Sequence, residues 1–134
     1  MKNNFFVWLL SLTWGVIMTV IGAITAIFLM FRGYIPTRFG PSWVFVIGKN
    51  WGGISLGPVV LVSAAASVAT IYHEVGHTIQ NALYGIAFPF IVAIPSVIRY
   101  WYREWKKPST PYDAIWFEGQ ATAWGIKYMD RQDK

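Results

Sequence analysis

The sequence predicts a mainly α-helical α+β domain that follows an N-terminal transmembrane helix. Three observations support this class. Residues 5–31 contain no charged residue, which is typical of a membrane span. Residues 43–47 and 54–62 are rich in β-branched and aromatic residues, which indicates strands. Residues 68–83 place apolar side chains at helical spacing around a metal-binding motif.

The composition favours contact with a membrane. Apolar residues make up 55% of the chain, aromatic residues 18% and charged residues only 13%, which is more apolar than an ordinary soluble domain. The 134 residues suffice for one modest core. We therefore expect an anchor at residues 1–32 and one membrane-associated domain at residues 33–134.

The charge and the absence of cysteine narrow the possible partners. The formal net charge is +5, but the basic residues are scattered among aromatic ones and no nucleic-acid motif is present. A lipid bilayer with anionic headgroups is therefore the expected partner, and nucleic acid is not. The chain has no cysteine, so a metal site must use His and carboxylate ligands.

Residues 5–31 are long enough to cross a hydrocarbon core of about 30 Å with some tilt. A cleaved signal peptide is the alternative, but the apolar run is too long and lacks a small-residue cleavage site. Arg32, Arg38 and Lys49 follow the segment, whereas Lys2 stands alone before it. The positive-inside rule then predicts a cell-membrane protein with a cytoplasmic domain.

The strands come next. Residues 33–42 contain two prolines and two glycines and predict a linker. Residues 43–47 and 54–62, on either side of a glycine-rich segment, predict a β-hairpin. A second span over residues 54–71 is the alternative, although its internal Gly-Pro pair suits a strand edge better. A strand ahead of the motif helix could pair with an extended peptide.

The motif is HExxH at residues 73–77, and it contains both histidines of the chain. On a helix, His73 and His77 lie on one side and can hold one metal ion. Glu74 then lies beside the metal, where it can accept a proton from a metal-bound water. The alternative is two histidines that lie four apart by chance in a membrane-associated helix. Gly76, inside the motif, lets another backbone approach closely.

The helix around the motif is predicted over residues 68–83, with Ser63 or Ser67 as its cap and Gly85 as its end. Its apolar residues are expected to face a core. They are Val68, Ile71, Val75, Ile79, Ala82 and Leu83. The histidines fall on the opposite, polar face, where Gln80 and Asn81 could contact ligands or substrate.

Two membrane-proximal segments follow. Residues 86–98 are apolar but only 13 residues long, with two prolines, so they are too short and too broken to span. We expect them to pack under the site or to dip into the membrane interface. Residues 99–107 alternate aromatic and basic side chains, which suits a helix in the lipid headgroup layer. A solvated helix face explains that pattern equally well.

The C-terminal helix is predicted to start at Thr110 and Pro111, with Asp113 completing the cap, and to stop near Gly125. Glu118 is the only acid in its apolar middle, and a buried lone carboxylate is costly unless it is paired or bound to metal. Glu118 is therefore the preferred third metal ligand. The remaining acids after the motif lie among basic residues, at the cap or in the polar tail; they are Glu104, Asp113, Asp130 and Asp133.

An ion pair of Glu118 with Arg99 or Arg103 is the structural alternative to metal binding. A closed, non-catalytic metal site would need a fourth ligand, which would have to be a carboxylate such as Asp113.

HExxH followed by a helical glutamate resembles the gluzincin metallopeptidases. The blocks NWGGISLGP, HEVGHTIQNALYG, IPSVIRYWYREW and YDAIWFEGQAT also resemble a family of small, uncharacterised membrane proteins of Gram-positive bacteria, over most of residues 51–125. The gluzincin resemblance implies that His73, His77 and Glu118 bind Zn²⁺ and that Glu74 is the general base. Thr122 stands where some gluzincins have an Asp that orients a ligand histidine.

The expected function is hydrolysis of peptide or protein substrates by a membrane-bound zinc metalloendopeptidase. A further donor to the developing oxyanion is expected, and Tyr112, Tyr84, Arg99 and Arg103 are candidates. The first alternative is a non-catalytic membrane protein with a structural metal site or an ion-pair cluster. The second is a membrane-interaction or immunity-type protein in which the motif helix has lost its function.

Overall fold

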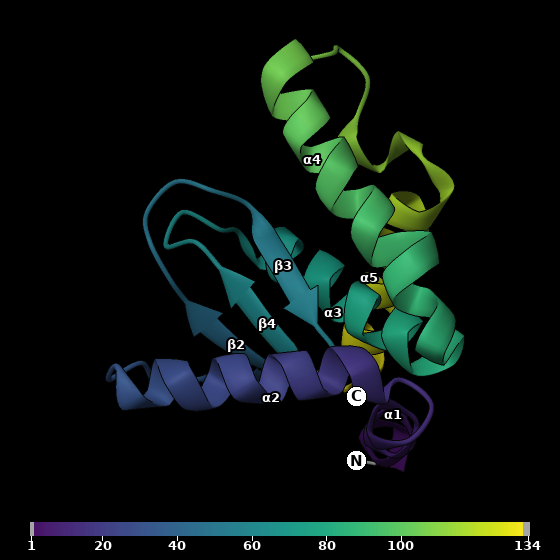
Figure 1. The fold of residues 1–134 in the computed structure, drawn as a ribbon. Helices are drawn as coiled ribbons and strands as arrows, with labels where there is room; N and C mark the ends of the chain where they lie inside the picture. The colour runs from purple at the N-terminus through teal and green to yellow at the C-terminus, as the bar shows by residue number, and fades with distance from the viewer. Residues whose placement is uncertain (1, 133–134) are drawn as a thin grey trace.

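The computed structural model describes residues 2–132, which form a mainly helical α+β unit around a small sheet (Figure 1). The α-helices are α1 (Lys2–Leu12), α2 (Val16–Phe31), α3 (Val68–Tyr84), α4 (Ile94–Lys106) and α5 (Trp116–Gln132). The strands are β1 (Thr37–Phe39), β2 (Ser42–Val46), β3 (Gly53–Leu56) and β4 (Val59–Val62). Short 3-10 segments cover Gly85–Ala87 and Tyr112–Ala114, and a π-helix covers Pro89–Ala93.

The sheet has the order β1-β2-β4-β3, with β2 parallel to β4 and the other two pairs antiparallel. The predicted hairpin between residues 43–47 and 54–62 is therefore wrong. Gly57, at a φ of +64°, turns the chain inside the second segment and makes a hairpin of β3 and β4. The predicted linker at residues 33–42 also contains a strand, β1. As a result, β3 lies at one edge of the sheet.

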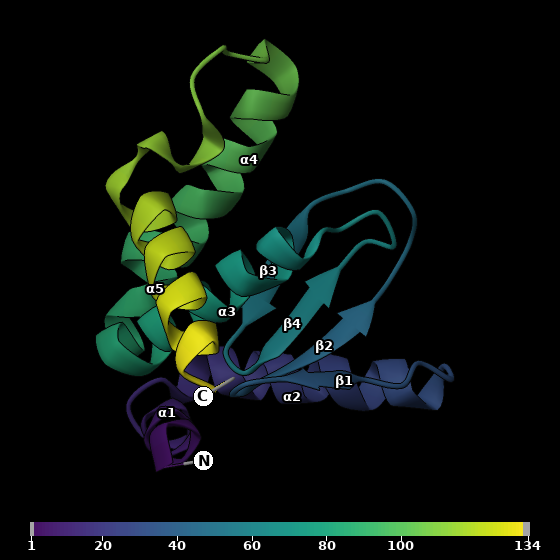
Figure 2. The same cartoon turned by 180° about the vertical axis from the view of Figure 1, so that it is seen from behind.

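The two faces of the sheet are covered by different helices (Figures 1 and 2). Leu29 of α2 packs on Phe45 and Val59, whereas Val44 and Val60 face Ile71 of α3. This division follows from the alternation of side chains along each strand. α5 then packs on α3 beyond the sheet, so the motif helix lies between the sheet and α5.

The predicted single helix over residues 5–31 is wrong, because the segment breaks at residues 13–15 and bends by 98°. The break is bonded to the end of α3. The Trp14 indole donates to the Leu83 carbonyl at 3.0 Å, and the Asn81 amide donates to the Gly15 carbonyl at 3.4 Å. Nothing in the local sequence signals this turn, because its partners lie almost 70 residues away.

Within the described residues 2–132, no single helix has both the length and the apolar character needed to cross a membrane. Two bent helix pairs meet that test by length and composition alone. They are Asn4–Leu12 with Val16–Phe31, and Val68–Ala87 with Pro89–Lys106, bent by 98° and 118° respectively.

The motif helix forms as predicted. α3 begins after Ser67, whose hydroxyl accepts from the Thr70 amide at 3.2 Å, and it ends at Gly85, whose φ is +59°. Its predicted core residues Val75 and Ala82 are buried, but Val68 and Leu83 are exposed. Most of the face that carries the motif is buried as well, because α5 covers it, and His73 is half-buried at its edge.

Close contact between α3 and α5 depends on two glycines. A Cβ on Gly76 would overlap the Ala121 carbonyl, and one on Gly125 would overlap the Tyr72 carbonyl. The first contact was predicted from Gly76. The predicted stop of the last helix near Gly125 is wrong, because α5 continues to Gln132.

The polar tail, residues 127–134, was expected to be solvated, but in the described residues up to 132 it is in part packed. Met129 is buried, and the Tyr128 hydroxyl donates to Asn4 Oδ1 at 2.6 Å. In residues 86–98, Phe88 and Val92 are buried against Met18 and Phe117, as expected for a segment that packs under the site.

We expect Gly76→Ala to destabilise the protein. The added methyl group would meet a backbone carbonyl that cannot rotate away, and overpacking typically costs about 1–3 kcal/mol, which exceeds the gain of roughly 1 kcal/mol in helix propensity. Thermal unfolding in detergent measures the change. Leu83→Ala, at an exposed position of the same helix, is the control and should change stability little. A Gly76→Ala protein as stable as wild type would contradict this packing.

Candidate metal centre

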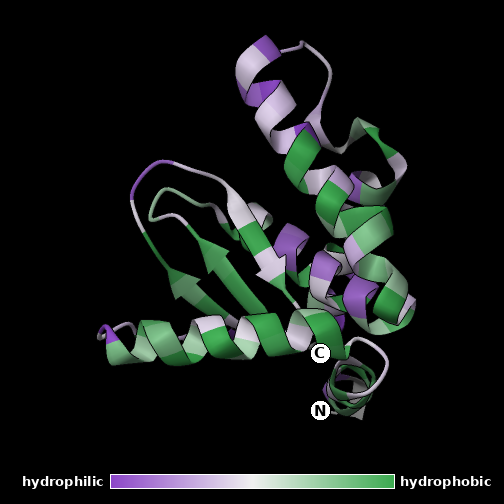
Figure 3. Cartoon of the chain, viewed as in Figure 1, coloured by the Kyte–Doolittle hydropathy of each residue, from purple (hydrophilic) through white to green (hydrophobic). Residues whose placement is uncertain are grey.

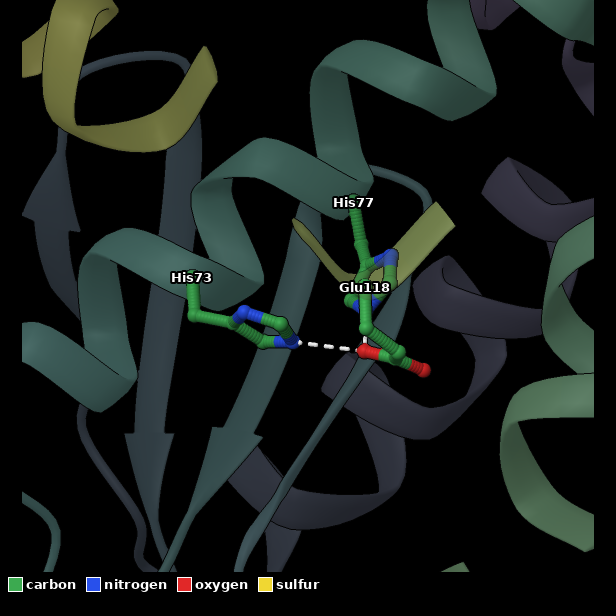
Figure 4. A group of neighbouring side chains, drawn as sticks. All are labelled: His73, His77 and Glu118. Carbon is green, nitrogen blue, oxygen red and sulfur yellow. Dashed lines mark hydrogen bonds and ion pairs between the residues drawn. The ribbon is translucent and has the colours of Figure 1, made fainter. Parts of the chain in front are cut away.

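Three side chains from two helices converge on one point. Nε2 of His73 and Nε2 of His77, both on α3, lie 2.9 and 3.2 Å from the same atom, Oε2 of Glu118 on α5 (Figure 4). One possible ligand atom from each residue lies within 4.8 Å of the others. Glu118 is fully buried, and His77 is 5% exposed. The structure thus brings together the two motif histidines and the glutamate predicted as third ligand.

The contacts of Gln80 fix the proton on the His77 ring. The Gln80 amide nitrogen donates to the Phe117 carbonyl at 2.8 Å, and a carbonyl can only accept. The Gln80 side-chain oxygen therefore faces His77 Nδ1, at 2.7 Å, and accepts its proton. In the metal-free site Nε2 of His77 also carries a proton, which it donates to Glu118; loss of that proton would free the Nε2 lone pair for a metal ion. Gln80 was predicted as a possible ligand contact.

His73 has a similar arrangement. Its Nδ1 lies 2.8 Å from the Thr122 hydroxyl, and its Nε2 faces Glu118. Thr122 thus takes the place that the gluzincin resemblance assigns to an orienting Asp. The second Glu118 oxygen accepts from the Ser96 hydroxyl of α4 at 2.5 Å. Each of the three side chains therefore has an orienting partner on its outer atom, and its inner atom faces the other two.

The donor set could hold a metal ion, and zinc is one ion that takes such ligands, although the ligand atoms spread over as much as 4.8 Å before any ion draws them together. Ligand atoms about 2.0–2.2 Å from a tetrahedral ion lie roughly 3.3–3.6 Å apart, close to the observed separations of 2.9 and 3.2 Å between the ring nitrogens and the carboxylate oxygen. Two imidazoles and one carboxylate make three ligands, the number found in catalytic zinc sites. In the part of the chain that the structure describes, no fourth residue joins the group. The side chain of Asp113, the predicted fourth ligand of a closed site, lies outside the described residues.

The surroundings of the two glutamates shift their pKa values in opposite directions. Burial acts to raise the pKa of Glu118, but hydrogen bonds from His73 and His77 outweigh it and lower that pKa well below its ordinary value. Glu118 is therefore a carboxylate. Burial raises the pKa of Glu74, although the two histidines oppose this shift. A raised pKa makes Glu74 a stronger base than an exposed glutamate.

A mainly apolar cavity of about 210 Å³ opens beside Glu74 and His77. The β3 edge forms one wall, and α4 with the π-helix before it forms another. Ile54 and Ser55 line it from β3, and Val92 and Trp101 line it from the helices. Glu74 reaches towards the start of β3, where a Cβ on Gly53 would lie 3.0 Å from its Oε1. The cavity therefore brings an unpaired strand edge next to the two polar residues.

Of the four predicted oxyanion donors, only Tyr112 lines this cavity. Tyr84 donates to Gln120 at 2.6 Å, away from the cavity, and Arg103 donates to the loop at Thr110. Arg99 donates to the Tyr112 carbonyl at 2.7 Å. Burial, together with the charge of Glu118, raises the pKa of Tyr112 to about 12, so its hydroxyl keeps its proton near neutral pH.

The alternative ion pair of Glu118 with Arg99 or Arg103 is not formed. Both guanidinium groups donate to backbone carbonyls, and the ion pairs of Glu118 found among the described residues are those with the histidines. Two residues that bond to the site, Ser96 and Gln120, were not predicted from the sequence. Ser96 lies in an apolar segment with no recognisable motif. Gln120 does not contact the three ligand candidates; its Oε1 accepts from Gln80 Nε2 at 2.9 Å.

No protein-family model matches the chain, and no curated protein or solved structure matches it. The gluzincin resemblance and the resemblance to small membrane proteins thus stay predictions.

We expect Thr122→Val to weaken zinc binding. Valine keeps the shape of threonine but loses the hydroxyl that orients His73, and loss of such a partner typically costs 10–100-fold in metal affinity, on the order of 1.4–2.7 kcal/mol. Competition with a chromogenic chelator measures the affinity. Thr25→Val is the control, since the Thr25 hydroxyl bonds only the Ile21 carbonyl of its own helix. Equal affinities of Thr122→Val and wild type would exclude the orienting role.

Proposed function

We propose that the protein is a membrane-bound zinc metallopeptidase that hydrolyses peptide bonds. The observation that carries the proposal is the convergence of His73, His77 and Glu118 next to Glu74 and an apolar cavity. Bound zinc would supply a Lewis acid and lower the pKa of a water towards about 7. The two histidines and Glu118 would hold the ion.

Glu74 would act as general base and later as general acid. It lines the cavity next to His77, it is not a member of the ligand group, and burial raises its pKa. It could therefore accept a proton from the attacking water and pass it to the leaving amine. The two glutamates have separate roles because one is held as a carboxylate by the histidines and the other is only desolvated.

The edge of β3 supports a peptide as the substrate. Gly53, Ile54 and Ser55 line the cavity, and β3 pairs on one side only, with β4. The free side of an edge strand offers backbone donors and acceptors to an extended chain. A peptide paired there would lie between β3 and α4, with its carbonyls near Glu74 and His77.

Tyr112 would donate a hydrogen bond to the oxyanion. It lines the cavity, its ring centroid lies 6.1 Å from that of His73, and its hydroxyl stays protonated at neutral pH. A donor already in place in a desolvated site stabilises developing charge without reorganisation.

The membrane location rests on the two N-terminal helices. Only Met18, Gly22 and Leu29 of α2 are buried, and its exposed face consists largely of isoleucine, valine and phenylalanine. A surface of this kind needs a cover. We propose that α1 and α2 anchor the protein in the cell membrane, with residues 33–134 on the cytoplasmic side.

A non-catalytic ion-pair cluster is the second candidate. Each histidine Nε2 already lies within hydrogen-bond distance of Glu118, so the three side chains satisfy one another without a metal. The two candidates differ in zinc content and in the need for Glu74.

We expect the detergent-purified wild type to hold about one zinc per chain, and Glu74→Gln to hold as much. Glu118→Ala should lose the metal, because two imidazoles alone bind weakly. Atomic absorption measures the content, and Glu104→Ala, at an exposed acid of α4, is the control. Zinc-free wild type, or Glu118→Ala with full zinc, would favour the ion-pair cluster.

We expect Tyr112→Phe to retain zinc but to lower kcat on a quenched fluorescent peptide library by about 10²–10³-fold, the usual cost of losing one oxyanion donor. Glu74→Gln should abolish the activity. Tyr34→Phe, at an exposed loop position, is the control for loss of a phenol hydroxyl. Full activity in Tyr112→Phe would remove Tyr112 from the mechanism.

A further inference from the structure

Most of the apolar face of α4 points away from the protein, and Trp101, at the border of this face, also lines the mouth of the cavity. Ile94, Ile98, Trp101 and Trp105 recur at helical spacing, and each is between 52% and 75% exposed. A helix of a globular protein normally turns such a stripe towards the core, yet no residue of α4 is buried in the described structure. A contiguous exposed stripe of this size marks an interaction surface.

The polar face of α4 is turned inward and is bonded to the body of the protein. Ser96 donates to Glu118 at 2.5 Å, Arg99 donates to the Tyr112 carbonyl at 2.7 Å, and Arg103 donates to the loop that follows α4. Rotation of the helix to bury its apolar stripe would break all three contacts. The stripe must therefore be covered from outside.

The order of residues along the helix identifies the cover. From the preceding π-helix to the end of α4, the ribbon changes from hydrophobic to hydrophilic (Figure 3). The exposed residues along it change from mainly apolar to aromatic and then to basic. In order they are Phe90, Ile91, Ile94, Val97, Ile98, Trp101, Tyr102, Glu104, Trp105, Lys106 and Lys107, so that Glu104 is the one acid among them. A bilayer presents the matching succession of acyl chains, interface and phosphates. An apolar protein groove offers no reason for this order.

We propose that this face of α4 docks on a bilayer that contains anionic phospholipids. The start of the helix is the deeper end, Trp101 and Trp105 lie at the interface, and Lys106 and Lys107 reach lipid phosphates. The chain's net charge of +5 favours anionic headgroups. The proposal depends neither on bound metal nor on peptidase activity, so its test uses neither.

The cysteine-free chain allows single labels to be placed on α4. The full chain, carrying Ile98→Cys or Trp101→Cys labelled with nitrobenzoxadiazole, is reconstituted into vesicles of phosphatidylcholine and phosphatidylglycerol. We expect doxyl lipids to quench both labels and aqueous iodide to leave them unaffected. Lys49→Cys, at an exposed position of the loop between β2 and β3, is the control and should behave in the opposite way.

Quenching of the α4 labels by iodide would overturn the proposal, because the stripe would then face water. Protection from both quenchers would also overturn it, because a second copy or another protein segment would then cover the stripe.

The charge dependence has its own test. In the Trp101→Cys background, Lys106→Gln combined with Lys107→Gln should reduce lipid quenching in anionic vesicles to the level seen in pure phosphatidylcholine, and added salt should act in the same direction. Lys127→Gln, at an exposed position of α5, is the matched control. Equal quenching in anionic and neutral vesicles, unchanged by the lysine substitutions, would remove the anionic lipid from the proposal.

Discussion

The close contact between α3 and α5 is the constraint on which the candidate site depends. The Ala121 carbonyl occupies the space that a side chain on Gly76 would need, and the Tyr72 carbonyl does the same at Gly125. These two contacts, one on each helix, fix how α5 lies along α3. Glu118 is consequently held between the two histidine rings. A larger residue at either glycine would separate the helices and the ligands with them.

The same contact buries a set of polar groups that would be costly if left unpaired. Glu118 is fully buried, but it accepts from Ser96 and faces both histidines. Gln80, also fully buried, bonds to His77 and to the Phe117 carbonyl of α5. The polar face of α3 is therefore not a solvated face. It is a second core, polar in composition, that has to be complete to be stable.

The parts of this arrangement that could be predicted from sequence are those set by local spacing. The motif helix follows from its periodicity and its cap at Ser67, and the position of Glu118 follows from the cost of burying a lone carboxylate. The strand pairing and the break at residues 13–15 depend on contacts between distant segments. Local sequence patterns therefore predicted both of them wrongly. Gly125 is the instructive case. It looked like a helix stop, whereas its role is to let the Tyr72 carbonyl approach.

The bonds that keep the apolar stripe of α4 turned outward also reach the candidate site. Ser96 holds the second oxygen of Glu118, and Arg99 holds the backbone of Tyr112. A further face of α4, which carries Val97, lines the cavity. A bilayer that fixes α4 would therefore fix Glu118, the backbone of Tyr112 and one cavity wall together. On this view the arrangement links lipid docking to the geometry of the metal centre, because α4 makes few other contacts with the protein.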